Sequence, residues 1–175
     1  FLSLGGEIFY NSAITKLIYD EERVKGVVVN NNIIEADSVI LASGGFEANE
    51  ELRKSYIGDE WVKAKVRGTP NNTGDGLKMA IEIGAVKHGL YDGCHATPMD
   101  LHMRDFGGLD LEPSERKNYR KICYFLGIMI NANGKRFLDE GKNFRNYTYA
   151  QYGRKVLEQP NNFAWQIFDS KVFNL

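Results

Sequence analysis

The sequence predicts an α+β fold on three observations. Up to about residue 42 the chain consists of short apolar runs separated by turn residues, as in an antiparallel meander. A polar, glycine-punctuated loop at residues 66–76 then leads into a short amphipathic helix at 76–83. Strand-like and helix-like segments follow in the last part of the chain. We therefore expect two regions, residues 1–91 and 92–175, of which the second is incomplete at its C-terminus.

Composition limits the classes of function. The chain has 175 residues, of which 43% are hydrophobic and 26% are charged, so it can bury a sizeable core. Its net charge of −1 gives no electrostatic reason to expect nucleic acid or an anionic membrane as a partner. We expect no transmembrane segment, because no apolar run is long enough to span a bilayer. Cys94 and Cys123 do not form a disulfide framework, which favours a reducing, cytoplasmic location.

The meander is built from five predicted strands, at residues 7–10, 14–20, 24–29, 33–36 and 38–41. Residues 39–42 are uniformly apolar, which is typical of a strand buried on both faces. This strand ends in Ser43-Gly44-Gly45-Phe46, a tight turn at which the backbone can approach a ligand closely. Asn49 is then expected to cap a helix at residues 50–56.

The glycine-punctuated loop is the stretch that points most directly to a ligand. In the helix that follows, apolar residues recur at helical spacing and Gly84 can end it in the left-handed conformation. We expect Thr73 or Asp75 to cap its start, while Gly74 and Gly76 carry no Cβ that would hold a ligand away. A helix N-terminus attracts phosphate or the electron-rich edge of a cofactor ring. Taken alone, the stretch is more typical of an ordinary capped helix behind a turn.

The second region has a looser pattern. Residues 107–120 are expected to form a mobile loop, and residues 122–131 a buried strand. A hairpin turn at 132–135, a helix at 146–157, a turn at 159–162 and a strand at 163–169 follow. His102 and Asp105 have loose metal-like spacing but no third ligand beside them, so no metal site is expected.

Three motifs in order carry a resemblance to a known family. They are Ala-Ser-Gly-Gly-Phe at 42–46, Asn-Thr-Gly-Asp-Gly at 72–76, and Asn-Ala-Asn-Gly-Lys-Arg-Phe-Leu-Asp-Glu at 131–140. Together they resemble the flavoprotein subunits of the fumarate reductase and succinate dehydrogenase superfamily. Residues 93–96 and 143–150 look closest to tricarballylate dehydrogenase within it. The resemblance implies a meander and strand–helix remnant of an FAD-binding domain, followed by an α+β capping domain that begins near residue 92.

The resemblance implies FAD as the cofactor of the full-length protein. It assigns the cofactor contacts to Ile14, Ala42, Ser43, Gly44, Gly45, Thr73, Gly74, Asp75 and Gly76. The Gly-x-Gly-x-x-Gly segment, which receives the pyrophosphate in this family, is absent from the 175 residues. We therefore expect the chain to be an internal piece of a longer protein, with the rest of the FAD domain missing at both ends.

Arg145 lies where the family places a catalytic arginine, allowing one extra residue in the loop. Its implied role is to move a proton to or from a substrate carbon while the flavin N5 moves a hydride at the neighbouring carbon. Its other possible roles are a bidentate clamp on a substrate carboxylate, or a plain surface arginine before a helix. His95 and Arg136 are the expected substrate-binding residues. Either Cys94 or His95 could match the family's polar, substrate-facing position, and His95 could instead be a structural histidine.

The leading hypothesis is an FAD-dependent oxidoreductase that acts on a C–C bond next to carboxylates, with an unidentified electron carrier as partner. Tyr119-Arg120-Lys121 stand where fumarate reductases carry a Thr-Glu pair, which favours a bulkier carboxylate than fumarate. One alternative is a 3-oxosteroid-type FAD dehydrogenase of the same superfamily, which acidifies a ketone with tyrosines and needs no arginine at position 145. The other is a non-catalytic phosphate- or nucleotide-binding module.

The purified 175-residue chain is expected to contain no FAD, because it lacks the pyrophosphate-binding segment. An absorbance spectrum of the preparation checks this. A yellow protein with stoichiometric flavin would show that the 175 residues do contain the pyrophosphate-binding part of the cofactor site.

Overall fold

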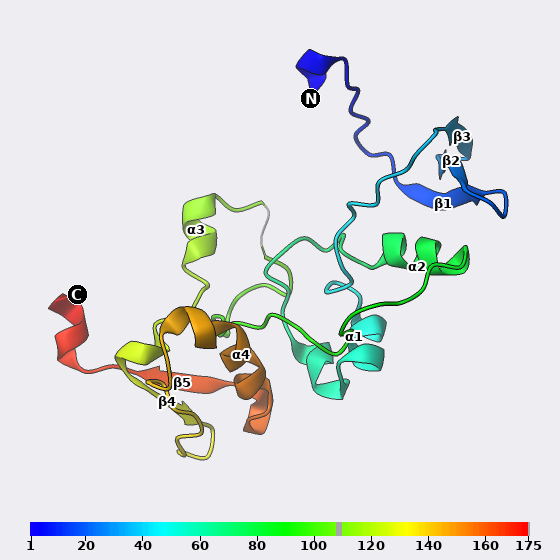
Figure 1. Ribbon diagram of the computed structural model, residues 1–175. Coiled ribbons are helices and arrows are strands. Elements are labelled where there is room, and N and C mark those ends of the chain that lie inside the picture. Colours follow the sequence, from blue (N-terminus) through cyan, green and yellow to red (C-terminus); the bar gives the residue numbers. More distant parts are fainter. Residues whose placement is uncertain (108–109, 175) are drawn as a thin grey trace. The chain divides into compact units, whose positions relative to one another are not determined.

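A computed structural model describes residues 1–107 and 110–174 (Figure 1). The chain forms two compact units, the first made of residues 1–46 and 73–89 and the second of residues 47–72 and 90–175. Residues 47–72 thus pack with the later part of the chain rather than with the meander that precedes them. The assignment of residues 1–91 to a cofactor domain and of 92–175 to a cap remains a prediction.

The first unit is a three-stranded antiparallel sheet, in the order β1-β2-β3, covered by a helix. Its strands are β1 (Ile14–Tyr19), β2 (Val24–Val29) and β3 (Asn32–Glu35). Asn30 and Asn31, at φ 49° and 64°, make the two-residue turn between β2 and β3, since two left-handed residues match the twist of a hairpin. The amphipathic helix α2 (Asp75–Glu82) packs against β1, and its Met79 closes the core over Leu17 and Val27.

Two predicted strands in this unit are wrong. Residues 7–10 are irregular, and so are residues 39–42. Val39 packs against the core, but the side chain of Ile40 is 90% exposed. An extended segment becomes a strand only when a neighbour pairs with its N–H and C=O groups. In the described part of the chain no strand lies alongside residues 39–42, so their apolar character is not enough.

The helix caps divide into one confirmed and one wrong prediction. Helix α1 (Glu50–Tyr56) is capped as expected, because the Asn49 side chain accepts a hydrogen bond from the Leu52 amide at 3.0 Å. In α2 the cap is Gly74, in the left-handed conformation at φ 86°. Thr73 donates its hydroxyl to the Asp75 carboxylate at 2.7 Å, so neither side chain is the cap. At the other end Gly84 is left-handed, as predicted.

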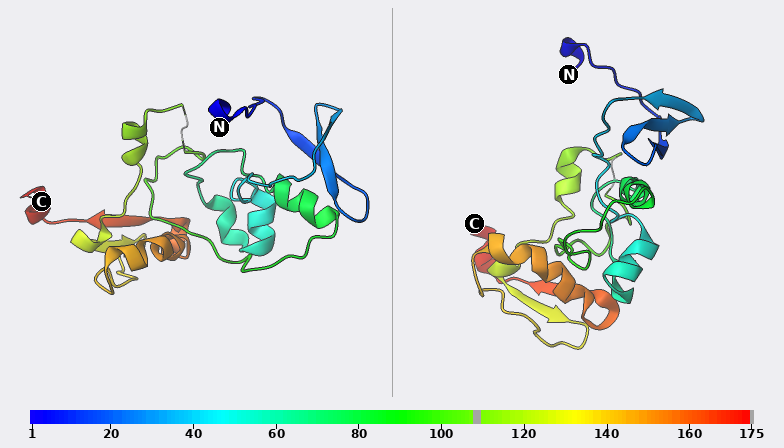
Figure 2. Two further views of the ribbon diagram at one scale, coloured as in Figure 1. Left: turned by 45° about the horizontal axis from the view of Figure 1, so that its top comes forward. Right: turned by 45° about the vertical axis from the view of Figure 1, so that its right-hand side comes forward.

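The second unit is an α+β arrangement around a two-stranded antiparallel sheet, β4 (Ile128–Asn131) and β5 (Ala164–Ile167), along which α4 (Arg145–Leu157) lies (Figures 1 and 2). Its core is Tyr124, Met129 and Tyr152. Helices α1 and α3 (Pro113–Lys117) also belong to this unit. So do the 3-10 helices η2 (Asp59–Lys63), η3 (Tyr124–Leu126), η4 (Pro160–Asn162) and η5 (Ser170–Asn174). One more, η1 (Leu2–Leu4), belongs to the first unit.

The predicted strand at 122–131 exists only in its second half. The first half is η3, in which Tyr124 turns inward and is fully buried. The predicted loop at 107–120 contains α3, which is held by a capping box between Glu112 and Glu115. Residues 108–109 of that loop lie outside the described residues. The hairpin turn is confirmed, because the Asn131 amide donates to the Lys135 carbonyl and Gly134 is left-handed.

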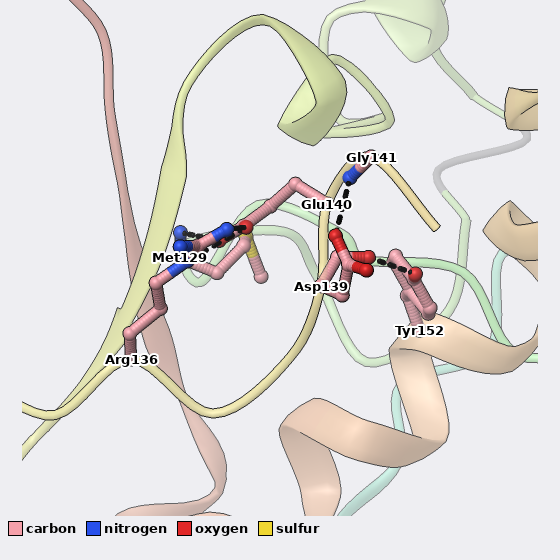
Figure 3. Close-up of polar contacts among 6 residues, drawn as sticks. All are labelled: Met129, Arg136, Asp139, Glu140, Gly141 and Tyr152. Atoms are coloured by element: carbon pink, nitrogen blue, oxygen red, sulfur yellow. Dashed lines mark hydrogen bonds and ion pairs between the residues drawn. The ribbon is translucent and has the colours of Figure 1, made fainter. Parts of the chain in front are cut away.

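A buried carboxylate fastens the loop between β4 and α4 (Figure 3). Glu140 is only 3% exposed and accepts hydrogen bonds from the Met129 amide at 2.6 Å and from Arg136 Nε at 2.9 Å. Arg136 Nη2 also donates to it. Burial pushes the pKa of Glu140 up, but these donors more than offset burial and leave that pKa below its usual range. Nearby, the Tyr152 hydroxyl donates to the Asp139 carbonyl, which ties the loop to α4.

Glu140→Gln is expected to lower the free energy of unfolding at pH 7 by about 1–3 kcal/mol, because it removes the acceptor charge that Arg136 and the Met129 amide surround. The pKa of Glu140 is lower in the folded state than its ordinary value of 4.5. The stabilisation by its carboxylate is therefore fully present above pH 4.5, and it is lost as the pH falls through the lower pKa of the folded state. Urea unfolding of both proteins at several pH values tests this.

Glu158→Gln is the matched control, because Glu158 pairs with Lys155 on the exposed side of α4 and should contribute little. An equal loss in the two variants, or a difference that does not shrink in acid, would contradict the buried-carboxylate account.

Candidate functional site

Two motifs that lie 30 residues apart in the sequence meet in the first unit. Ser43 lies against the start of α2, where a Cβ placed on Gly76 would be only 2.1 Å from the Ser43 Oγ. Any larger residue at position 76 would have to displace the Ser43 side chain. Gly44, at φ 79°, gives that turn its left-handed step. The predicted cofactor residues at 43–45 and 73–76 therefore share one small region.

This region presents polar groups that fit a nucleotide cofactor. Ala42, Ser43 and Gly44 are exposed, and within the described residues their amides donate no backbone hydrogen bond. The first amides of α2 and the Ser43 hydroxyl lie beside them. Such donors at a helix start suit the phosphates or the electron-rich ring edge of a flavin nucleotide. Ile14, the expected adenine contact, begins β1 opposite Val29 in the same unit, and its contact stays a prediction.

Arg145 is the first residue of α4, in the second unit. Phe144 precedes it with no side-chain cap, and the first turn holds no acidic residue. The N-terminus of a helix carries a partial positive charge, which is unfavourable for an arginine placed there. An anion that binds at this point is attracted by the partial charge of the helix and by the guanidinium together. The Arg145 side chain is exposed, and its guanidinium carbon lies 5.9 Å from the centre of the Phe125 ring. Nη2 also donates weakly to Asn146 Oδ1 at 3.4 Å.

A strap at residues 95–97 brings His95 to the same helix. The Ala96 amide donates to the Ala150 carbonyl at 2.9 Å, and the Ala96 carbonyl accepts from the Gly153 amide at 3.0 Å. The His95 ring then meets the edge of Tyr149, with centroids 5.2 Å apart at 86°. Tyr149 lies four residues after Arg145, on the same helical face. His95 thus lies against Tyr149, one turn along the helix that Arg145 begins.

Arg136 is not brought into this arrangement. Two of its donors hold Glu140, and its loop lines an open hollow of about 620 Å³ together with Phe137, Leu138 and Asp139. Its part in substrate binding remains a prediction. The sequence reasoning missed Tyr149 and Gly153; the four-residue spacing from Arg145 would have indicated Tyr149, whereas nothing local indicates the strap.

Two further findings concern metal sites and membrane-spanning helices. Among residues 1–107 and 110–174, no three His, Cys, Asp or Glu side chains gather as a metal site would require. Within the same described residues, no helix is long and apolar enough to cross a membrane.

Comparison with protein families decides the relationship. Residues 1–173 match the model of the FAD binding domain family. The chain belongs to this family. Membership implies FAD in the full-length protein, and the donors around Ser43 and the start of α2 fit that cofactor.

Relatives of the chain include 3-oxosteroid dehydrogenases and fumarate reductases. The chain is 30% identical to a 3-oxosteroid 1-dehydrogenase of Mycolicibacterium smegmatis, over 95% of this chain and 30% of that protein. It is also 30% identical to a probable fumarate reductase of Shewanella frigidimarina, over 93% of this chain and 26% of that protein. The chain therefore spans less than a third of the length of these relatives.

Solved structures of family members agree with the fold. The open conformation of a flavocytochrome c3 fumarate reductase superposes with a TM-score of 0.65 at 29% identity, covering 94% of this chain and 27% of that one. The 3-ketosteroid delta1-dehydrogenase of Sterolibacterium denitrificans gives a TM-score of 0.69 at 28% identity, covering 97% and 30%. The resemblance to fumarate reductase flavoproteins is confirmed, and the narrower one to tricarballylate dehydrogenase stays a prediction.

Gly153→Ala is expected to destabilise the protein by about 1–3 kcal/mol, because a Cβ there would lie 2.5 Å from the Ala96 carbonyl carbon and must displace the strap. The sign is informative, since glycine to alanine inside a helix ordinarily stabilises by up to about 1 kcal/mol. Urea unfolding measures it. Gly141→Ala, where the nearest atom would be 3.7 Å away, is the control, and a stabilised Gly153→Ala would mean that the strap is not seated on α4.

Proposed function

We propose that the protein to which this chain contributes is an FAD-dependent oxidoreductase acting on a C–C bond next to carboxylates. The observation that carries the proposal is the start of α4, where Arg145 follows no capping side chain and no acidic residue offsets its charge. A cation added to the positive end of a helix dipole favours an anionic ligand strongly. His95, which lies against Tyr149 of the same helix, adds a polar ring suited to a second carboxylate.

In this proposal FAD would be held by the groups around Ser43 and the start of α2, and it would supply hydride transfer at one substrate carbon. Arg145 holds or moves the proton at the neighbouring carbon, or fixes a carboxylate with its planar fork. A guanidinium releases a proton reluctantly, so the relay requires the exclusion of water and the closeness of other cations. The relatives named as fumarate reductases support an acid as substrate, and a tricarballylate-like acid is the finer form of the proposal.

A second candidate is a 3-oxosteroid dehydrogenase. Relatives of that name match the chain as well as the fumarate reductases do, at 30% and 31% identity. A neutral ketone provides no negative charge to pair with Arg145. The absence of an acidic residue in the first turn of α4 would then have no explanation. The start of α4 therefore favours the acid. We further propose a cytoplasmic enzyme that exchanges electrons with an unidentified carrier.

In the full-length enzyme, Arg145→Lys is expected to lower kcat by more than about 10²-fold if the arginine relays a proton in the rate-limiting step, because lysine keeps the charge but differs in geometry and proton affinity. A clamp role predicts instead that the loss appears mainly in KM. Stopped-flow reduction of the bound flavin by succinate, tricarballylate and a 3-oxosteroid separates these cases.

Arg154→Lys is the matched control, because Arg154 is in the same helix but stacks over Trp61, away from its start. Flavin reduction at the normal rate in Arg145→Lys would end the proton-relay role. Reduction by the steroid alone, in an enzyme that tolerates Arg145→Ala, would replace the proposal by the second candidate.

A further inference from the structure

We infer that the 3-10 helix η3 is a positioning device for Arg145, in which Tyr124 holds the arginine main chain and Phe125 holds its guanidinium. The inference rests on the proposed function, because it concerns the residue proposed to act on the substrate. The two residues are consecutive in the chain, so one short turn holds both ends of Arg145. Neither residue touches the substrate in this account, and both act through Arg145.

The Tyr124 half of the device is a pair of buried hydroxyls under the first turn of α4. Tyr124 is fully buried and its hydroxyl lies 2.6 Å from the Thr148 Oγ1. The Arg145 carbonyl is within reach of both, at 3.4 Å from the tyrosine and 3.3 Å from the threonine. One hydroxyl therefore donates to the other, and the second donates to the carbonyl. This pins a helix start that would otherwise fray.

Tyr124 is itself held rigidly. Its ring centroid lies 4.6 Å from that of Tyr152, and both belong to the core with Met129. Tyr152 is fixed in turn by donating its hydroxyl to the Asp139 carbonyl. The position of the Arg145 main chain is thus tied to the best-packed part of the second unit.

The Phe125 half of the device is a cation–π contact. The Arg145 guanidinium carbon is 5.9 Å from the Phe125 ring centre, at the outer limit for this interaction. The ring is 43% exposed and the Arg145 side chain is exposed as well, so a ligand can still reach the guanidinium. A long side chain that is already restrained loses less freedom when a ligand binds, and this preorganisation favours the reacting geometry.

The experiment uses the full-length enzyme with FAD bound and tricarballylate as the probe. Tyr124→Phe and Phe125→Leu are each expected to lower kcat/KM by about 3- to 20-fold, the range that a lost hydroxyl contact or cation–π contact supports. Phe125→Tyr keeps the ring face and is expected to restore the activity. Tyr19→Phe is the matched control for Tyr124→Phe, because it removes a tyrosine hydroxyl that also donates to a main-chain carbonyl, that of Glu21, but in the first unit.

A double-mutant cycle separates positioning from general damage. In the Arg145→Ala background neither Tyr124→Phe nor Phe125→Leu should lower kcat/KM further. Full additivity, or equal losses in Tyr124→Phe and Tyr19→Phe, would overturn the inference.

A spectroscopic readout keeps the inference distinct from the proposed function. The Arg145 Nε–H resonance, assigned by its absence in Arg145→Lys, should be shifted by the ring current of Phe125 and should lose that shift in Phe125→Leu. Loss of the shift together with normal turnover in Arg145→Ala would uphold the contact and refute the proposed function. An unchanged resonance in an enzyme that needs Arg145 would refute the contact alone.

Discussion

The second unit depends on one buried charge, the carboxylate of Glu140. A carboxylate that is 3% exposed must be compensated, and Arg136 and the Met129 amide do this. The compensation joins the loop at 136–141 to β4, and the neighbouring Asp139 carbonyl joins it to Tyr152 of α4 (Figure 3). The family motif at residues 131–140 therefore has a structural role, because it holds the loop that precedes α4 against that helix.

Helix α4 is the platform on which the proposed chemistry stands. Its start carries Arg145 without an opposing acid, its middle receives the strap through Ala96, and η3 lies under its first turn. Each contact uses a different physical property of the helix: the dipole at its start, two backbone groups along its side, and a carbonyl in its first turn. The first unit is simpler, since the approach of Ser43 to Gly76 alone brings together the groups that suit a flavin nucleotide.

The sequence by itself determined the features that depend on neighbours along the chain. The turn between the strands predicted at 24–29 and 33–36, the cap at Asn49 and the apolar stripe of α2 could all be predicted, because turn, cap and helical period are local properties. The order of three motifs was enough to place the chain in its family.

Tertiary structure alone decided what depends on residues distant in the sequence. Residues 39–42 had the composition of a strand but have no partner strand in the described part of the chain. Arg136 is expected from the sequence to bind substrate, and only the tertiary structure shows that two of its donors bind Glu140. His95 reaches the face of Arg145 only because Ala96 binds the backbone of α4 where Gly153 has no Cβ. A backbone contact leaves no side-chain pattern, and a buried charge selects its partner in space, so neither is encoded in local spacing.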